Sequence, residues 1–256
     1  MQVCSMCKQE AELQSSHAIP DAFFRKILKK QSGKYIVVPG GGNSPIHYSS
    51  DSWDTHQLCS PCEIHLNKNY ETYAIKLLRG SACKVVKHIH GVTFSGVESH
   101  ILVGFFISIF WRAANSEHPN YSKVIIPEPW NTEFRELLLA KNNIPLRLAT
   151  IRLSRLIDRT KNDGFTLDSL KNIVMTPFFR KGVSHKYSFC FVFEGFFIEI
   201  FIPGLSLAKR KLPGVLNNKI KIIFVPFLDI FDVPEIVEVL VEGYSKFVDG
   251  DVTFKN

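Results

Sequence analysis

The chain has 256 residues, of which 45% are hydrophobic, so it is long enough for one large domain or for a small module beside a larger one. This composition excludes extensive disorder. The formal net charge of +7 favours a polyanionic partner such as nucleic acid.

The cysteines and the apolar runs indicate the compartment. The longest apolar stretch, residues 101–110, is shorter than the about 20 residues that a membrane span needs, so it predicts a buried helix and no membrane association. No apolar leader precedes Cys4. Six cysteines without an export signal indicate a cytoplasmic protein that binds metal rather than forming disulfides, with Cys83 and Cys190 as buried thiols.

Residues 1–90 form a polar, histidine- and cysteine-bearing section that we expect to be a separate zinc module. Phe23, Phe24 and Ile27 stand at helical spacing and predict a helix over Asp21–Lys30. Residues 32–51 are rich in Gly, Ser and Pro, which indicates a loop or a hairpin insertion. Pro61 favours a helix start, and this helix is expected to run to about Arg79.

Residues 91–256 predict an accessory α+β domain in which helices come first and an antiparallel sheet follows. The fold class is therefore α+β. The expected helices are residues 98–116, residues 133–141, a third possible helix with Arg152, Arg155 and Arg159 on one face, and residues 234–247 capped by Asp232. The expected strands are residues 186–194 and 196–203, joined as a hairpin at Glu194-Gly195, and residues 219–227.

Two Cys-x-x-Cys pairs, Cys4/Cys7 and Cys59/Cys62, are the strongest motif in the chain. Together they supply the four thiolates of a tetrahedral zinc site. Such a site is structural, because it leaves no coordination position for a substrate. The first pair lies in a short turn and the second opens a helix, which is the layout of a treble-clef finger. Chance pairs or a redox motif are the alternatives.

The residues between and after these pairs carry a family resemblance. Ser16-His17-Ala18-Ile19-Pro20 stands between the pairs, and Leu58 and Glu63 flank the second pair. Over residues 1–80 the chain resembles the HNH endonuclease superfamily in its zinc-stabilised form, in particular a bacterial branch with Ser-His-Ile-Ile-Pro and Leu-Cys-x-x-Cys-Glu. The resemblance implies a ββα unit that holds one catalytic divalent ion, such as Mg²⁺.

Carried onto this sequence, the resemblance assigns His17 as the general base that takes a proton from the attacking water. It assigns the catalytic ion to Glu63 with Asp54 or His56, the nearest matches to the family's middle asparagine. Ser16 departs from the family's usual aspartate. The plainer alternatives are that His17 caps a turn or supports the zinc site, and that Glu63 only favours the helix dipole.

The resulting expectation is a metal-dependent, HNH-like DNA endonuclease with structural zinc, with a role in defence against foreign DNA by analogy only. Its accessory domain would supply targeting, homodimerisation or binding of a protein partner. The alternative is a non-catalytic zinc-finger module that binds nucleic acid or a protein. A third hypothesis places the activity of a toxin or effector in the C-terminal domain.

The basic residues expected to suit phosphate contacts are Arg25, Lys26, Lys29, Lys30 and Lys34, with the Arg152/Arg155/Arg159 stripe and Lys209-Arg210-Lys211.

Overall fold

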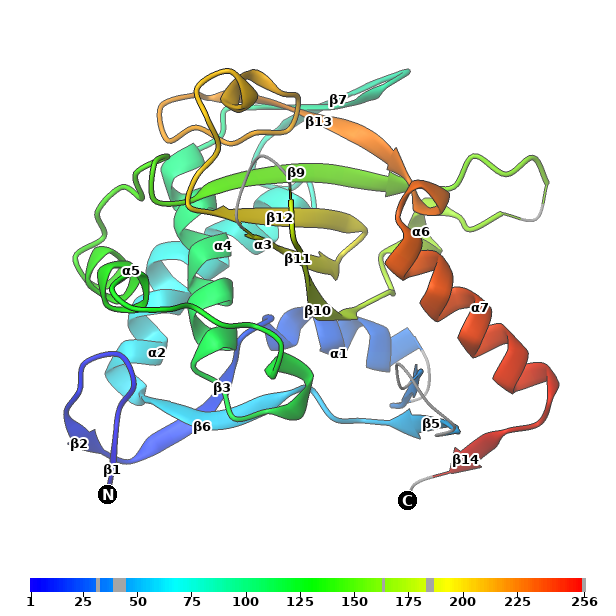
Figure 1. Cartoon of the computed structure of the whole chain (residues 1–256), viewed down its shortest axis with the longest axis horizontal. Helices are drawn as coiled ribbons and strands as arrows, with labels where there is room; N and C mark the ends of the chain where they lie inside the picture. Colours follow the sequence, from blue (N-terminus) through cyan, green and yellow to red (C-terminus); the bar gives the residue numbers. More distant parts are fainter. Residues whose placement is uncertain (31–32, 39–44, 163, 183–186, 255–256) are drawn as a thin grey trace.

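The computed structural model describes the chain except residues 31–32, 39–44, 163, 183–186 and 255–256 (Figure 1). It is a mixed α+β protein, as expected, built around one large sheet with helices on both of its faces. Among the described residues, no helix has the length and apolar character needed to cross a membrane.

Seven of the described strands form the large sheet, in the order β10-β11-β12-β9-β13-β8-β7. Their bounds are β7 Lys84–His88, β8 Gly91–Ser95, β9 Thr150–Ile157, β10 Met175–Arg180, β11 Tyr187–Phe193, β12 Phe196–Ile202 and β13 Ile222–Asp229. Neighbouring strands are antiparallel except β9 and β13, which pair in parallel. The expected antiparallel sheet is therefore wrong in this detail: β12 occupies one side of β9, and β13 returns on the other side in the same direction as β9.

The third possible helix is also wrong, because its residues form strand β9. Ile151 and Leu153 are fully buried on the side of the larger hydrophobic core, and Leu156 is buried in the smaller core on the other face. Ile151 and Leu153 alternate with Arg152 and Ser154, but the alternation breaks at Arg155, and the arginine spacing resembles that of a helix face. Arg152 lies beside Glu199 of β12, whereas Arg155 packs over the ring of Phe196.

The other helices follow the expectations closely. Helix α1 is Asp21–Lys30, α4 is Ser99–Ala114, and α5 is Trp130–Leu139, which begins earlier than the expected residue 133. The short helix α6, Leu167–Leu170, was not predicted. Helix α7 is Pro234–Val248, but the expected cap is wrong: Val233 is the N-cap, and Asp232 belongs to the preceding 3-10 turn, Ile230–Asp232. The helix at Pro61 is also confirmed, as α2 Ser60–Leu66, a π-helical turn Asn67–Glu71 and α3 Thr72–Leu78.

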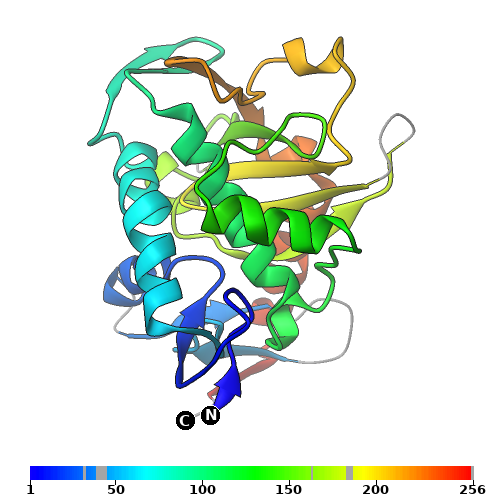
Figure 2. The ribbon, with the colours of Figure 1, turned by 90° about the vertical axis from the view of Figure 1, so that its left-hand side faces the viewer.

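Helix α4 is the central element of the larger core. It runs beside the large sheet (Figure 2) and is buried along nearly its whole length. Phe106 and Phe110 pack against Phe193 and Phe189 of β11. On the opposite face of the sheet, a smaller core joins Cys190 to Ile236 of α7. Cys190 is a buried thiol as expected, while Cys83 is only half-buried.

Two small pairings flank the zinc motifs, and a hairpin lies in the predicted insertion. Strands β1 Gln2–Val3 and β2 Glu10–Ala11 pair with each other, as do β3 Leu13–His17 and β6 Asp54–Cys59. Strands β4 Tyr35–Val37 and β5 Ile46–Ser49 form the hairpin, and the C-terminal β14 Val252–Phe254 pairs with β5 in parallel. Of the predicted insertion, Ser32 and residues 39–44 lie outside the described residues.

The division at residue 90 stays a prediction. It falls in the β7–β8 turn, and one hydrophobic cluster includes residues from both sides of it. The β11–β12 turn, in which Glu194 and Gly195 both have positive φ, also connects the two sections. The buried carboxylate of Glu194 lies 2.6 Å from Nζ of Lys26 and 3.3 Å from the guanidinium of Arg79.

We expect Glu194→Gln to lower the free energy of unfolding by about 2 kcal/mol, because two cations lose their buried partner. The loss is smaller than for a fully buried pair, since the side chains of Lys26 and Arg79 are 27% and 34% exposed. Urea denaturation measures it, with the exposed Glu136→Gln as the control. Equal stability of the two variants would contradict this role of Glu194.

Candidate functional site

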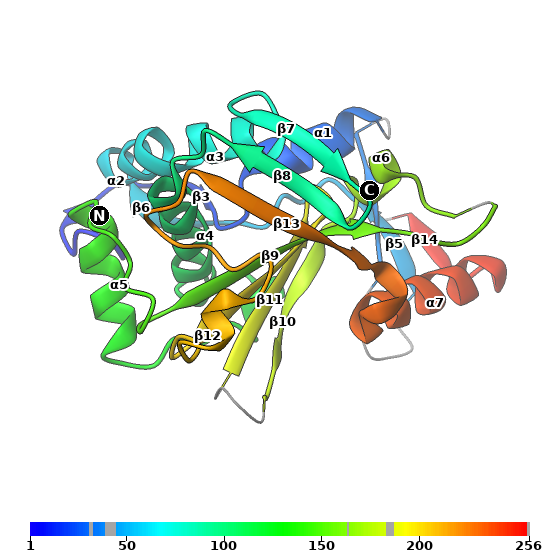
Figure 3. The ribbon, with the colours of Figure 1, turned by 90° about the horizontal axis from the view of Figure 1, so that it is seen from above.

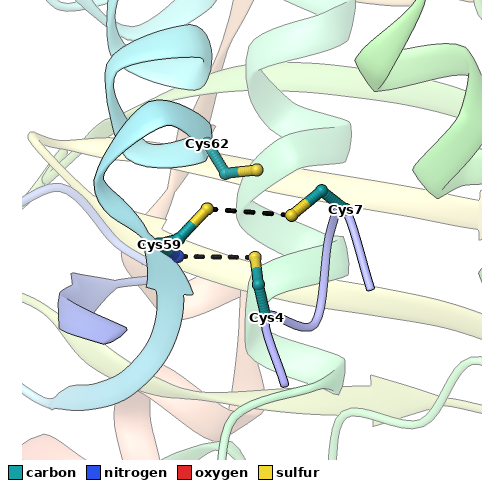
Figure 4. A group of neighbouring side chains, drawn as sticks. All are labelled: Cys4, Cys7, Cys59 and Cys62. Atoms are coloured by element: carbon teal, nitrogen blue, oxygen red, sulfur yellow. Dashed lines mark hydrogen bonds between the residues drawn. The ribbon is translucent and has the colours of Figure 1, made fainter. Parts of the chain in front are cut away.

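The four motif cysteines meet in one place. Their sulfur atoms all lie within 4.8 Å of one another, and the Sγ atoms of Cys7 and Cys59 are 3.7 Å apart (Figure 4). Cys4, Cys59 and Cys62 are buried, and Cys7 is half-buried. The chain therefore holds four thiol groups in position for a single metal ion such as zinc.

Local backbone structure accounts for this arrangement. Cys4 and Cys7 lie in the tight turn between β1 and β2, which Lys8 closes with a positive φ of 62° and a hydrogen bond from its N–H to the carbonyl of Cys4. Cys59 ends β6 and is the N-cap of α2, so that Cys62 falls in the first turn of this helix. The N–H of Cys59 donates to Sγ of Cys4 at 3.4 Å and joins the two pairs.

The electrostatics of the cluster suit a cation. Burial raises the pKa of Cys4. Hydrogen bonds from backbone N–H groups, of which that of Cys59 is the strongest, have a larger opposite effect and lower the pKa of Cys4 to about 7. Burial raises the pKa of Cys59 and of Cys62. One thiolate therefore forms readily, and further thiolates need a positive charge beside them. Four soft sulfur donors fit Zn²⁺.

His17 lies at the end of β3, opposite Asp54 of β6, and the neighbouring pair is Ser15 and His56. These four side chains share one face of the strand pair, because alternate residues of a strand point the same way. His17 and Asp54 are half-buried, while Ser15 and His56 are exposed. The structure thus brings three of the predicted site residues, His17, Asp54 and His56, to one face.

Asp54 is held in its ionised form. The hydroxyl of Ser15 donates to Oδ2 of Asp54 at 2.5 Å, and this bond lowers the pKa of Asp54 more than burial raises it. His17 and His56 contribute further lowering. Nε2 of His17 lies 2.8 Å from the hydroxyl oxygen of Ser52.

Glu63 lies elsewhere. Its Oε2 is 4.0 Å from the guanidinium of Arg112, a buried residue of α4 that also pairs with Glu71 at 3.1 Å. In the described part of the chain, the cysteine quartet alone brings three or more Cys, His, Asp or Glu ligand atoms together. Glu63 is therefore not joined to His17, Asp54 and His56 in a second cluster of this kind.

Ser16, which stands at the family's aspartate position, is buried and fully used by the backbone. Its hydroxyl accepts from the N–H of Leu58 at 3.1 Å and donates to the carbonyl of Gln14 at 3.3 Å. These bonds lie at the irregularity in the β3–β6 register between Gln14 and Ser15. The side chain thus stabilises the strand pair.

Two contacts near the site were missed by sequence reasoning. Ser52 gave no signal, because its approach to His17 depends on the strand register. Arg112 did give one: it ends an otherwise apolar run, and a buried guanidinium requires carboxylate partners. Glu63 and Glu71, about two turns apart on the same continuous helix, were available to fill that need.

Comparisons of the chain with protein-family models, with curated proteins and with solved structures give no match in any of the three. The geometry of these residues is therefore the guide to what the chain does.

We expect the purified protein to contain about one zinc ion per chain. Cys7→Ser should lose this zinc and lower the Tm by about 10 °C, because the ion contributes folding free energy to a region with little core of its own. Metal analysis and thermal denaturation measure both effects. The control is Cys83→Ser, which lies outside the quartet and should keep the zinc. Full zinc content in Cys7→Ser would contradict the assignment.

Proposed function

We propose that β3, β6 and α2 form an HNH-like ββα unit, closed by zinc in a treble-clef arrangement, that hydrolyses phosphodiester bonds of DNA. The observation that carries the proposal is the position of His17. It ends the first strand of the pair, faces the ionised Asp54 on the second, and is separate from the cysteine quartet. A histidine in this position is available for proton transfer.

The contacts of His17 suit a general base. The hydroxyl of Ser52 occupies Nε2 and orients the ring, whereas Nδ1 makes no hydrogen bond to the described residues. Nδ1 is then the atom that takes the proton from water. The negative charge of Asp54 stabilises the imidazolium that forms.

Two residues of this face, Asp54 and His56, could bind a hard divalent ion, but the third predicted ligand, Glu63, is not among them. Asp54 offers an ionised carboxylate and His56 an exposed imidazole on the same face. Glu63, paired with Arg112, is not in their cluster. A bound Mg²⁺ would supply charge neutralisation for the phosphate during hydrolysis.

A second candidate function is a zinc module that binds nucleic acid or a protein without cleaving it. Ser16 favours it, because it stands where the family usually has an aspartate for the catalytic ion and its hydroxyl is used by the backbone. The position of Glu63, 4.0 Å from Arg112 and in no ligand cluster with Asp54 and His56, also favours it.

In the presence of Mg²⁺ or Mn²⁺, we expect the zinc-loaded protein to nick supercoiled plasmid. His17→Ala should reduce the nicking rate by about 100-fold or more, because a positioned general base contributes this much. The matched control is His100→Ala, a partly exposed histidine at the start of α4. Absence of nicking by the zinc-loaded wild type, together with retained DNA binding, would select the non-catalytic function.

Asp54 and Glu63 should differ in their effect on the same assay. Asp54→Asn removes the charge opposite His17 and should lower the nicking rate about tenfold or more, whereas Glu63→Gln should change it less than about threefold. Zinc content verifies that both variants retain the site. A larger loss in Glu63→Gln than in Asp54→Asn would show that Glu63, and not Asp54, serves the reaction.

A further inference from the structure

The positive charge of this chain is concentrated in two segments. Residues 84–97 and 203–228 contain seven Lys and Arg and no Asp or Glu. The remainder of the chain has 24 Lys and Arg against 24 Asp and Glu, so the two segments account for the whole formal charge of +7. The seven cations are Lys84, Lys87, Lys209, Arg210, Lys211, Lys219 and Lys221.

The two segments lie side by side in the fold. Strands β7 and β8 come from the first and β13 from the second, and they form one end of the large sheet (Figure 3). The turn that carries Lys209–Lys211 leads to Gly214, which approaches the ring of Pro226 in β13 so closely that a Cβ there would lie 3.0 Å from it. In Figures 1 and 2 this end lies opposite β3 and β6.

One face of these three strands is open. Phe94, Ile223 and Val225 point into the larger core. The alternate residues form cross-strand rows on the other side, namely Ile222–Ser95–Lys84, Phe224–Thr93–Val86 and Pro226–Gly91–His88. Ile222 and Phe224 are 63% and 37% exposed, although Ile223 and Val225 on the other face of β13 are buried. Val86 of the edge strand β7, which is exposed along its whole length, is 38% exposed.

Phe224 is placed as a flat platform in the middle of this open face. Its ring lies across Gly91, where a Cβ would come within 2.6 Å of the ring atoms. The imidazole of His88 lies beside it, with 6.2 Å between the ring centroids, and is held by the hydroxyl of Thr93 at 3.0 Å. Lys84, which is exposed, stands in the first row, and the exposed Lys221 comes directly before Ile222 at the start of β13.

We propose that the open face of β7, β8 and β13 binds single-stranded nucleic acid. Bases stack on Phe224 and His88, and the phosphates contact Lys84, Lys219 and Lys221. An exposed aromatic ring bordered by cations is the common design of single-strand binders, because every base has a face that stacks. A duplex keeps its bases inside its own stack, so it offers phosphates to the lysines but nothing to Phe224.

This site goes beyond the proposed hydrolysis at His17 and lies at the other end of the molecule. It would anchor a strand whether or not His17 cleaves one. The two proposals can therefore be tested independently, if binding is measured under conditions in which the protein cannot cleave nucleic acid.

The test uses fluorescence anisotropy with a labelled oligothymidylate of about 20 nucleotides and the full-length His17→Ala protein in Mg²⁺-free buffer. Phe224→Ala should weaken binding about tenfold, as expected for loss of a stacked base. The control is Tyr244→Ala, which removes a 72% exposed aromatic ring from α7, outside this face, and should bind normally.

A second variant does not touch the core. Lys219→Ala with Lys221→Ala removes two exposed charges and should reduce the slope of log K against log salt by about 1.4, or 0.7 for each phosphate contact. Wild-type affinity in both the Phe224 and the lysine variants would overturn the proposal. Equal affinity for a matched duplex, with no effect of Phe224→Ala, would also overturn it in favour of a duplex-binding or general polyanion surface.

Discussion

The N-terminal part of the fold depends on the convergence of four cysteine thiol groups on one position. Cys7 and Cys59 are 52 positions apart in sequence, yet their sulfur atoms are 3.7 Å apart. Burial disfavours a second and third thiolate, as the raised pKa values of Cys59 and Cys62 indicate. A bound cation offsets this cost of forming buried thiolates, because each thiolate is attracted to the cation. We therefore propose that a zinc ion, when bound by the four cysteines, stabilises the N-terminal section in this form.

Other features of the fold follow from this closure. It sets the end of β6 against the β1–β2 turn, and the β3–β6 register then places His17 opposite Asp54. It also sets the direction of α2, which continues through a π-helical turn to α3. Tyr70 in that turn packs on Gly104 of α4, where a Cβ would lie 2.4 Å from its ring, so the N-terminal section and the main core share a close contact.

The sequence predicted those parts of the structure that depend on local patterns. The apolar spacing in α1, the turn at Glu194-Gly195 and the spacing of the cysteine pairs are such patterns, and all three are confirmed. Strand β9 was mistaken for a helix, because arginines at helical spacing stand in a segment buried on both faces. The parallel pairing of β9 with β13 and the contact of Glu63 with Arg112 arise only from tertiary structure, so no local pattern signals them.

The molecule thus presents two chemically different regions at opposite ends, a His17–Asp54 face beside the thiol cluster and an open basic sheet face around Phe224. On our proposal, the arrangement of the first region depends on a metal ion bound by the four cysteines. X-ray absorption at the zinc edge of the purified protein is the most direct test of this dependence. Our account predicts four sulfur neighbours at about 2.3 Å and no nitrogen or oxygen. A shell containing nitrogen or oxygen, or fewer than four sulfurs, would contradict it.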